Sequence, residues 1–154
     1  MDILKKVYTK LFRKGHPFLI FIVEDDVIYA KTLEFYLKNN LCAESEILYF
    51  PVGELAVENF HLKPDLILMD YHLNSSYFEA VDGIENIKII KTSYPKTHVI
   101  LLSSQKRIEV AVEAFAEYAC YYVVKDNEAL RKLAKIINHK IKEKEERAIV
   151  AYAI

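Results

Sequence analysis

The fold is decided by the stretch FLIFIVEDD, residues 18–26. Its first six residues are apolar without alternation, which is typical of a central parallel strand buried on both faces. The run ends abruptly in Glu24, Asp25 and Asp26, and a helical pattern then continues through about Lys38. The stretch therefore predicts a buried strand that carries carboxylates at its carboxyl end.

Similar apolar runs of strand length recur at 47–50, 66–69, 99–102 and 121–124. Helical patterns lie between them, near 53–62, 82–93 and 105–118, and a last one runs from about residue 127 to the end. Strands that alternate with helices, joined by right-handed crossovers, form a parallel sheet with helices on both faces. We therefore predict an α/β fold with a five-stranded, doubly wound parallel sheet, preceded by a short amphipathic helix over 3–14.

The length of 154 residues, with 53% hydrophobic and 28% charged residues, fits one globular domain. No apolar run approaches the ~20 residues that cross a bilayer. The two cysteines, Cys42 and Cys120, lack metal-ligand spacing and are expected to be thiols in a reducing compartment. These features predict a cytoplasmic protein.

The net charge of −1 conceals a segregation of charge along the chain. Residues 1–16 carry five Lys/Arg and one acidic residue, and residues 131–147 carry seven and three, so each end is +4 and the remainder −9. Solvated helix faces account for such ends most simply. Contact with nucleic acid or an anionic membrane is the alternative.

Polar side chains follow the predicted strands at their carboxyl ends, where the ligand site of such folds lies. The first strand is followed by Glu24 and Asp25, and the third, fourth and fifth end near Asp70, Ser103 and Lys125. Two carboxylates about 4 Å apart repel by about 4 kcal/mol at an effective dielectric of about 20, so a cluster of them requires a cation or protons. Oxygen ligands that leave places for water and phosphate favour Mg²⁺.

Five short motifs carry a resemblance to a known family: FIVEDD (21–26), PDLILMD (64–70), DG (82–83), LLSS (101–104) and YVVKD (122–126). Together they resemble the receiver domain of bacterial two-component response regulators, the CheY-like superfamily, whose fold is flavodoxin-like. With this resemblance the chain divides into a basic amphipathic helix over 1–16, a receiver domain over 17–140 and an extension of the last helix over 141–154.

The resemblance implies roles in phosphoryl transfer for the acidic residues. Asp70 is the expected phospho-acceptor. Glu24, Asp25 and Asp70 are the expected ligands of Mg²⁺, joined by the backbone carbonyl of His72. Asp26 is instead expected to cap the following helix, a common role for an aspartate between a strand and a helix.

Three further residues complete the site that the resemblance implies. Lys125 and Ser103 are expected to hold oxygens of the phosphoryl group, and closing a helix start is the alternative role of Ser103. Tyr122, three residues before the lysine, matches the aromatic switch position of the family. An ordinary half-buried aromatic is its alternative interpretation.

The loop after the acceptor departs from the family. It reads YHLNSSYFEAV over residues 71–81, several residues longer than usual and without the common proline. We expect this loop to cover the site in part or to contact a partner.

By resemblance, the chain is a response regulator that accepts a phosphoryl group from a sensor histidine kinase or a histidine phosphotransfer protein onto Asp70. It would signal by a conformational shift that changes the binding of a downstream protein, and it would not be an enzyme with other substrates. Two alternatives stay open: a non-phosphorylated pseudo-receiver scaffold, and a Mg²⁺-dependent phosphatase with Asp70 as nucleophile. Such phosphatases usually carry a second aspartate where this chain has His72.

Only 29 residues follow Lys125, in one helical pattern, so no DNA-binding, cyclase or methylesterase output domain is expected in this chain. A homodimer is a candidate assembly. It would form through the last helix or through the face made by the fourth helix, the fifth strand and the fifth helix of the receiver. The apolar residues of that interface would be Leu130, Leu133, Ile137 and Ile141.

Overall fold

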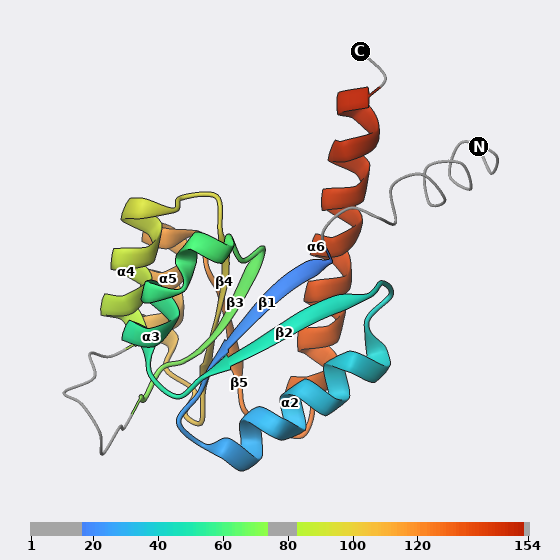
Figure 1. Cartoon of the computed structure of the whole chain (residues 1–154). Helices are drawn as coiled ribbons and strands as arrows, with labels where there is room; N and C mark the ends of the chain where they lie inside the picture. Colours follow the sequence, from blue (N-terminus) through green and yellow to red (C-terminus); the bar gives the residue numbers. More distant parts are fainter. Residues whose placement is uncertain (1–16, 74–82, 153–154) are drawn as a thin grey trace.

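A computed structural model describes residues 17–73 and 83–152 of the chain. Within these residues five parallel strands form one sheet in the order β2-β1-β3-β4-β5 (Figure 1). The strands are β1 (Phe18–Val23), β2 (Ser45–Phe50), β3 (Leu66–Asp70), β4 (His98–Ser103) and β5 (Tyr121–Val124). All five were predicted from the apolar runs of the sequence, and β1 lies inside the sheet as expected.

Helices cover both faces of the sheet. They are α2 (Val27–Asn40), α3 (Gly53–Glu58), the 3₁₀ turn η1 (Phe60–Leu62), α4 (Gly83–Ser93), α5 (Ile108–Tyr118) and α6 (Ala129–Tyr152). Figure 1 shows α2 and α6 on one face and α3, α4 and α5 on the other, which confirms the doubly wound arrangement. The predicted helix over 3–14 and most of the predicted long loop over 71–81 lie outside the described residues.

The alternation of side chains along the strands divides the interior into two cores. In β1, Ile20 and Ile22 face the core under α2 and α6, whereas Phe21 and Val23 face the core under α3, α4 and α5. All four side chains have no exposed surface. A strand that is apolar on both faces is therefore required here, because each face packs against its own layer of helices.

Two predicted helices differ from the observed ones. The helix predicted over 53–62 divides into α3 and η1, and the tighter turn of η1 brings the buried Phe60 ring against Tyr94, with their centroids 4.6 Å apart. The helix predicted from residue 105 begins only at Ile108. The residues before Ile108 are instead held by hydrogen bonds to side chains of Ser103 and Tyr122.

The residues predicted to form a dimer interface lie largely inside the protein. Leu133, Ile137 and Ile141 are at most 2% exposed and belong to the core between α6 and the sheet, with Leu130 half-buried against it. The prediction that this set forms an intermolecular surface is therefore wrong, because the set already covers the sheet. Homodimerisation itself stays a prediction.

No helix in the described part of the chain is long and apolar enough to span a bilayer.

Candidate functional site

The acidic residues meet because β1 and β3 are neighbours in the sheet. Val23 of β1 is paired with Met69 of β3, so the residues that follow them, Glu24 and Asp70, emerge side by side. The strand order reverses at this pair, which is where parallel α/β sheets open a crevice for ligands. The backbone N–H of Glu24 donates to the carbonyl of Phe50, 3.0 Å away, and this bond fixes the end of β1.

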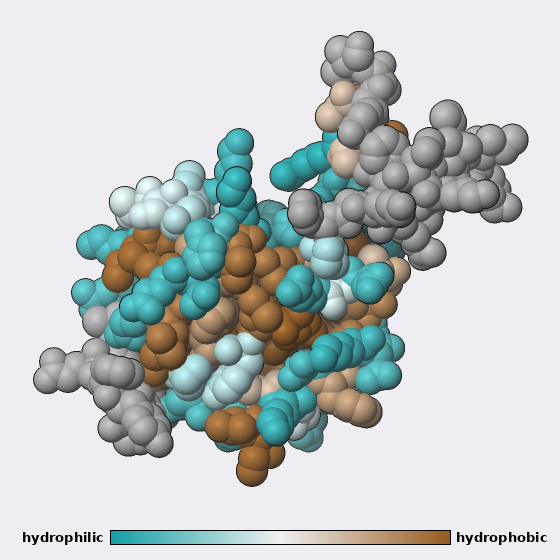
Figure 2. All heavy atoms as spheres, in the orientation of Figure 1, coloured by the Kyte–Doolittle hydropathy of each residue, from teal (hydrophilic) through white to brown (hydrophobic). Residues whose placement is uncertain are grey.

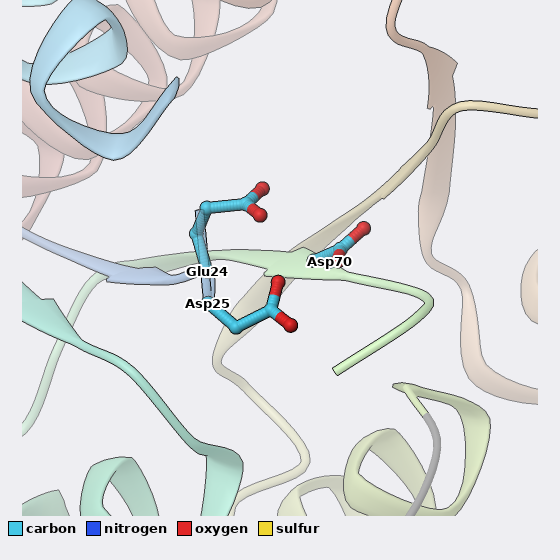
Figure 3. Close-up of side chains that lie close together, drawn as sticks. All are labelled: Glu24, Asp25 and Asp70. Atoms are coloured by element: carbon cyan, nitrogen blue, oxygen red, sulfur yellow. The ribbon is translucent and has the colours of Figure 1, made fainter. Parts of the chain in front are cut away.

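Three carboxylates gather at this point. Glu24, Asp25 and Asp70 each offer an oxygen within 4.8 Å of the others, and the three side chains lie close together (Figure 3). Glu24 and Asp70 are buried, and Asp25 is half-buried at the rim. The three residues predicted to bind a metal through their carboxylates are therefore brought together.

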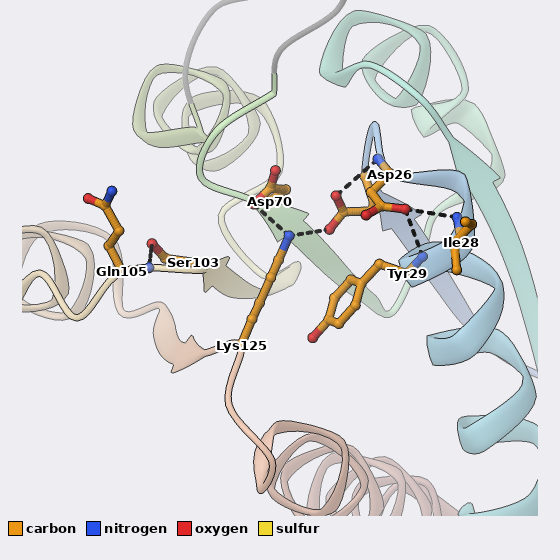
Figure 4. A network of polar contacts seen from close by, with 8 residues as sticks. Asp26, Ile28, Tyr29, Asp70, Ser103, Gln105 and Lys125 are labelled. Carbon is orange, nitrogen blue, oxygen red and sulfur yellow. Dashed lines mark hydrogen bonds and ion pairs between the residues drawn. The ribbon is translucent and has the colours of Figure 1, made fainter.

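Lys125 supplies the positive charge of the cluster. Its Nζ lies 2.7 Å from Glu24 Oε2 and 3.0 Å from Asp70 Oδ1 (Figure 4). The backbone N–H of Lys125 donates to the carbonyl of Ser103 at 2.8 Å, which places the lysine at the shared end of β4 and β5. One lysine thus joins two carboxylates from two different strands.

The protonation of Glu24 is strongly perturbed. Burial raises the pKa of Glu24 from 4.5 to about 7; the hydrogen bond from Lys125 opposes this shift and the charge of Asp70 adds to it. A buried carboxylate loses the water that stabilises its charged form, and one lysine shared between two acids replaces that water only in part. The cluster therefore lacks positive charge near neutral pH.

The pKa values of Asp70 and Lys125 are also raised. Burial raises the pKa of Asp70, although Lys125 and a hydrogen bond from the backbone of His72 lower it. Burial alone would lower the pKa of Lys125, but the hydrogen bond and charge of Glu24, with the charge of Asp70, produce a net rise. Lys125 therefore stays a cation in this site.

The cluster fits a hard divalent cation. Its ligands are carboxylate oxygens only, and the half-buried Asp25 leaves one side open to water or phosphate. The raised pKa of Glu24 supports this fit, because it shows that the ionised carboxylate lacks positive charge nearby. A cation here would supply the charge that Lys125 does not. Of the ions that prefer oxygen ligands, Mg²⁺ suits a site with few protein ligands.

The neighbouring Asp26 has the separate role that the sequence predicted. Its Oδ1 accepts from the backbone N–H groups of Ile28, at 2.9 Å, and Tyr29, at 3.0 Å, and so caps α2 (Figure 4). Adjacent aspartates thus differ in direction, since Asp25 turns toward the carboxylates and Asp26 toward the helix.

This difference gives a matched pair of variants. Asp25→Ala should weaken Mg²⁺ binding at least about tenfold, because it removes one of three charged ligands. Asp26→Ala should leave the Mg²⁺ affinity unchanged while lowering stability by about 1 kcal/mol through the lost cap. Isothermal titration with Mg²⁺ measures both affinities. An unchanged affinity in Asp25→Ala would place the metal elsewhere.

Ser103 and Tyr122 are linked through the loop that follows β4. The fully buried Ser103 hydroxyl oxygen accepts from the backbone N–H of Gln105 at 3.2 Å. The Tyr122 hydroxyl donates to the carbonyl of Gln105 at 2.5 Å and accepts from the backbone N–H of Arg107 at 3.3 Å. Ser103 does not cap α5, whose N-cap residue is Arg107, so the alternative role predicted for it is wrong.

His72 lies just outside the acid cluster. Its half-buried ring contacts Tyr71 edge-on, with centroids 4.6 Å apart, and the guanidinium of Arg107 lies 5.5 Å from the centre of the Tyr71 ring. These contacts tie the residues after Asp70 to the loop before α5. The role of the His72 carbonyl as a metal ligand stays a prediction.

One aromatic residue of the site was missed in the sequence. The ring of Tyr29 lies under Lys125, whose Nζ is 4.6 Å from the ring centroid (Figure 4). A cation held over an aromatic face is stabilised and restricted in direction. The signal in the sequence was its position, because Tyr29 lies in the first turn of the helix that follows Glu24 and Asp25 and so stays close to the end of β1.

The family comparison agrees with this geometry. The chain matches the family model described as the response regulator receiver domain over residues 20–138. Those residues hold every site residue named above.

The curated relatives are longer proteins. A transcriptional regulatory protein LnrK from Bacillus subtilis is 35% identical over 68 residues, 44% of this chain and 29% of its own length. A protein-glutamate methylesterase/protein-glutamine glutaminase from Trichodesmium erythraeum is 29% identical over 115 residues, 70% of this chain and 30% of its own. The chain thus spans about a third or less of the curated relatives it matches.

Solved structures share the fold. The signal receiver domain of a putative LuxO repressor protein from Vibrio parahaemolyticus superposes with a TM-score of 0.72 at 21% identity, covering 87% of this chain and 98% of that one. A CheY-like response regulator receiver domain protein from Methanospirillum hungatei gives a TM-score of 0.71 at 20% identity, covering 86% and 99%.

Proposed function

Because the chain belongs to the response regulator receiver domain family of two-component systems, we propose that it is a switch that accepts a phosphoryl group on Asp70. The donor is a phosphohistidine of a sensor kinase or of a phosphotransfer protein. The observation that carries the proposal is the contact of Lys125 with both Glu24 and Asp70 inside a cluster of three carboxylates. The family match does not favour a phosphatase, and the intact cluster of carboxylates with its lysine argues against a pseudo-receiver scaffold.

The chemistry is a displacement at phosphorus. An oxygen of the Asp70 carboxylate attacks in line, a new P–O bond forms, the P–N bond to the donor histidine breaks, and that histidine keeps the electron pair and takes up a proton. Asp70 is suited to this role because its carboxylate stands at the end of β3, fixed by Lys125 and by the backbone of His72. Such a step needs little beyond positioning and the stabilisation of charge.

Lys125 and the acid cluster supply the charge stabilisation. Glu24, Asp25 and Asp70, with the His72 carbonyl, would hold Mg²⁺, which supplies positive charge to the phosphoryl oxygens. Lys125 would exchange its bond to Asp70 Oδ1 for a phosphoryl oxygen while its ammonium stays over the ring of Tyr29. The lysine can make this exchange because its pKa is raised and it keeps its charge.

The conformational change that follows phosphorylation would begin at Ser103. A phosphoryl oxygen on Asp70 would accept a hydrogen bond from the Ser103 hydroxyl, whose oxygen accepts from the Gln105 N–H, and Tyr122 holds the same loop through the Gln105 carbonyl. A change at Ser103 therefore reaches Tyr122 and the start of α5. Moving such an equilibrium from 1:99 to 99:1 takes about 5.5 kcal/mol of differential stabilisation.

The surface next to Tyr122 is suited to bind a downstream protein. Ile108, Val112 and Phe115 of α5 are 68%, 60% and 70% exposed. With Tyr122 they line an apolar groove of about 420 Å³ between α5 and β5. Exposed apolar patches of this kind mark protein interaction sites.

Intact-mass spectrometry tests the proposal. Incubation of the full chain with acetyl phosphate and Mg²⁺ should give a single phosphoryl adduct, and EDTA should prevent it. No adduct, in a protein that binds Mg²⁺, would instead indicate the scaffold. Rapid release of phosphate without an adduct would indicate the phosphatase.

A further inference from the structure

A second polar cavity lies at the opposite end of the sheet from the acid cluster. It has a volume of about 260 Å³ and is lined by α6, by the connections before β3 and β4, and by the first residues of β1 and β4, Phe18 and His98. α6 extends beyond the sheet at this end of the molecule (Figure 1), and hydrophilic side chains project around it (Figure 2). We call this cavity the basal pocket.

Cations outnumber anions in the basal pocket. Its charged lining residues are the cations Lys96, Lys140, Lys144 and Arg147 and the anions Asp65 and Glu143. The excess is notable because the chain as a whole has a net charge of −1. The cations come from two separate elements, the connection between α4 and β4 and one face of α6.

Both anions are already engaged. Asp65 accepts from Lys144, at 2.7 Å to Oδ1, and from the backbone N–H of Leu19, at 2.9 Å to Oδ2. Glu143 lies 3.0 Å from Lys140 and 3.1 Å from the ring of His139. The two carboxylates therefore have little capacity left to neutralise the other cations of the pocket.

Two cations of the pocket remain uncompensated. Lys96 and Arg147 are exposed, and neither forms an ion pair with any residue of 17–73 or 83–152. They stand on different elements, so an anion between them would meet positive charge from two directions. An arginine and a lysine together suit an anion with several oxygens, because the guanidinium offers a planar set of donors and the ammonium a point charge.

The surroundings of His98 show the same excess of positive charge. Burial lowers the pKa of its half-buried ring, and Lys140, Lys91 and Arg147 lower it further against the single opposing charge of Glu143. The ring forms no hydrogen bond with the described residues, so its N–H is available as a neutral donor in the lining of the pocket.

We propose that the basal pocket binds a small anion with two linked phosphoryl groups, held by Lys96 and Arg147. The volume is slightly below the ~300–1,000 Å³ of pockets for drug-sized ligands, which fits a compact and highly charged ligand. Two separated cations favour two phosphoryl groups over one. The pocket is independent of the phospho-acceptor site, although β1 and β4 each run from one site to the other.

Calorimetric titration of the full chain with inorganic pyrophosphate in EDTA tests the proposal. EDTA keeps metal away from the acid cluster, whose own charge repels anions. Lys96→Ala/Arg147→Ala should weaken binding at least about tenfold, the order expected when charge-assisted hydrogen bonds are lost. Lys88→Ala/Lys135→Ala is the matched control, since these exposed lysines of α4 and α6 lie outside the pocket. The control should bind as the wild type does.

Further measurements locate the site and identify the ligand. The His98 ring resonances should shift with pyrophosphate saturation in NMR spectra. Orthophosphate should bind more weakly than pyrophosphate, and equal binding of ADP would show that a nucleoside diphosphate is accepted. Three results would each overturn the proposal: no saturable binding of pyrophosphate, the same loss of affinity in both double variants, or no shift of the His98 ring resonances. Thermal unfolding confirms that both double variants are folded.

Discussion

Asp70→Asn should show no Mg²⁺-dependent phosphoryl adduct in intact-mass spectra, under conditions that label the wild type. The amide keeps the size of the carboxylate and can still accept from Lys125, 3.0 Å away in the wild type, but it is not a nucleophile toward phosphorus. The loss should be complete on the time scale of the experiment. A positioned group gains an effective concentration of about 10⁵–10⁸ M over an unpositioned one, so carboxylates on the surface cannot replace the buried Asp70 at a measurable rate.

The matched control for this variant is Asp126→Asn. Asp126 lies two residues after β5, but its carboxylate accepts from the backbone N–H of Glu128 at 2.9 Å and pairs with Lys132 at 3.1 Å. These contacts are with the turn before α6 and with its first turn, not with the acid cluster, so this variant should be labelled like the wild type. Circular dichroism and a thermal midpoint close to the wild-type value should show that Asp70→Asn is folded. An adduct retained in folded Asp70→Asn would assign the acceptor to another residue.

The strands and the acid cluster were predictable because their cause is local in the sequence. A run such as FLIFIV is buried on both faces wherever it lies in a doubly wound sheet, and polar residues directly after such runs must emerge at one edge. The cap formed by Asp26 was predictable for the same reason, since its partners are the two N–H groups of the next helical turn. In each case the position of the residue along the chain, directly after a strand or before a helix, determines where its side chain lies.

Other contacts between distant elements, away from the strand ends, were not predictable. Tyr122 reaches the loop before α5 through Gln105 and Arg107, fifteen and more residues away, and this contact delays the start of that helix. The face of α6 that carries Leu133, Ile137 and Ile141 has the spacing of an interface, and the sequence alone does not say whether the sheet or a second molecule covers it. Which elements pack together in three dimensions decides where such a helix begins and what covers its apolar face.

Glu24→Gln should stabilise the metal-free protein at about pH 8 by about 3 kcal/mol. The pKa of Glu24 is raised from 4.5 to about 7 in the folded state, and each unit corresponds to about 1.4 kcal/mol. The folded protein holds this proton more tightly than the unfolded chain. The contribution of Glu24 to the stability of the wild type is therefore fully present below pH 4.5 and is lost as the pH rises through about 7. Glutamine is never charged, so it avoids this loss.

Urea unfolding in EDTA at several pH values between about 4 and 8 measures the effect. The stability of Glu24→Gln relative to the wild type should be near zero at the acidic end and should rise to its full value above pH 7. Comparison at each pH removes the contributions of other titrating groups. Glu58→Gln is the control, because Glu58 is exposed in α3 and should follow the wild type at every pH.

Mg²⁺ should reverse the order of stability, because it supplies the charge that makes an ionised Glu24 favourable. A ligand present at about 1,000 times its dissociation constant stabilises the folded state by about 4.1 kcal/mol, which exceeds the advantage of the glutamine variant. Glu24→Gln should gain much less, since it lacks one charged ligand. A site that is destabilising when empty and stabilising when filled is the pattern expected of a functional cluster. If Glu24→Gln were the less stable protein in EDTA at pH 8, Lys125 alone would satisfy Glu24, and the electrostatic argument for a metal here would fail.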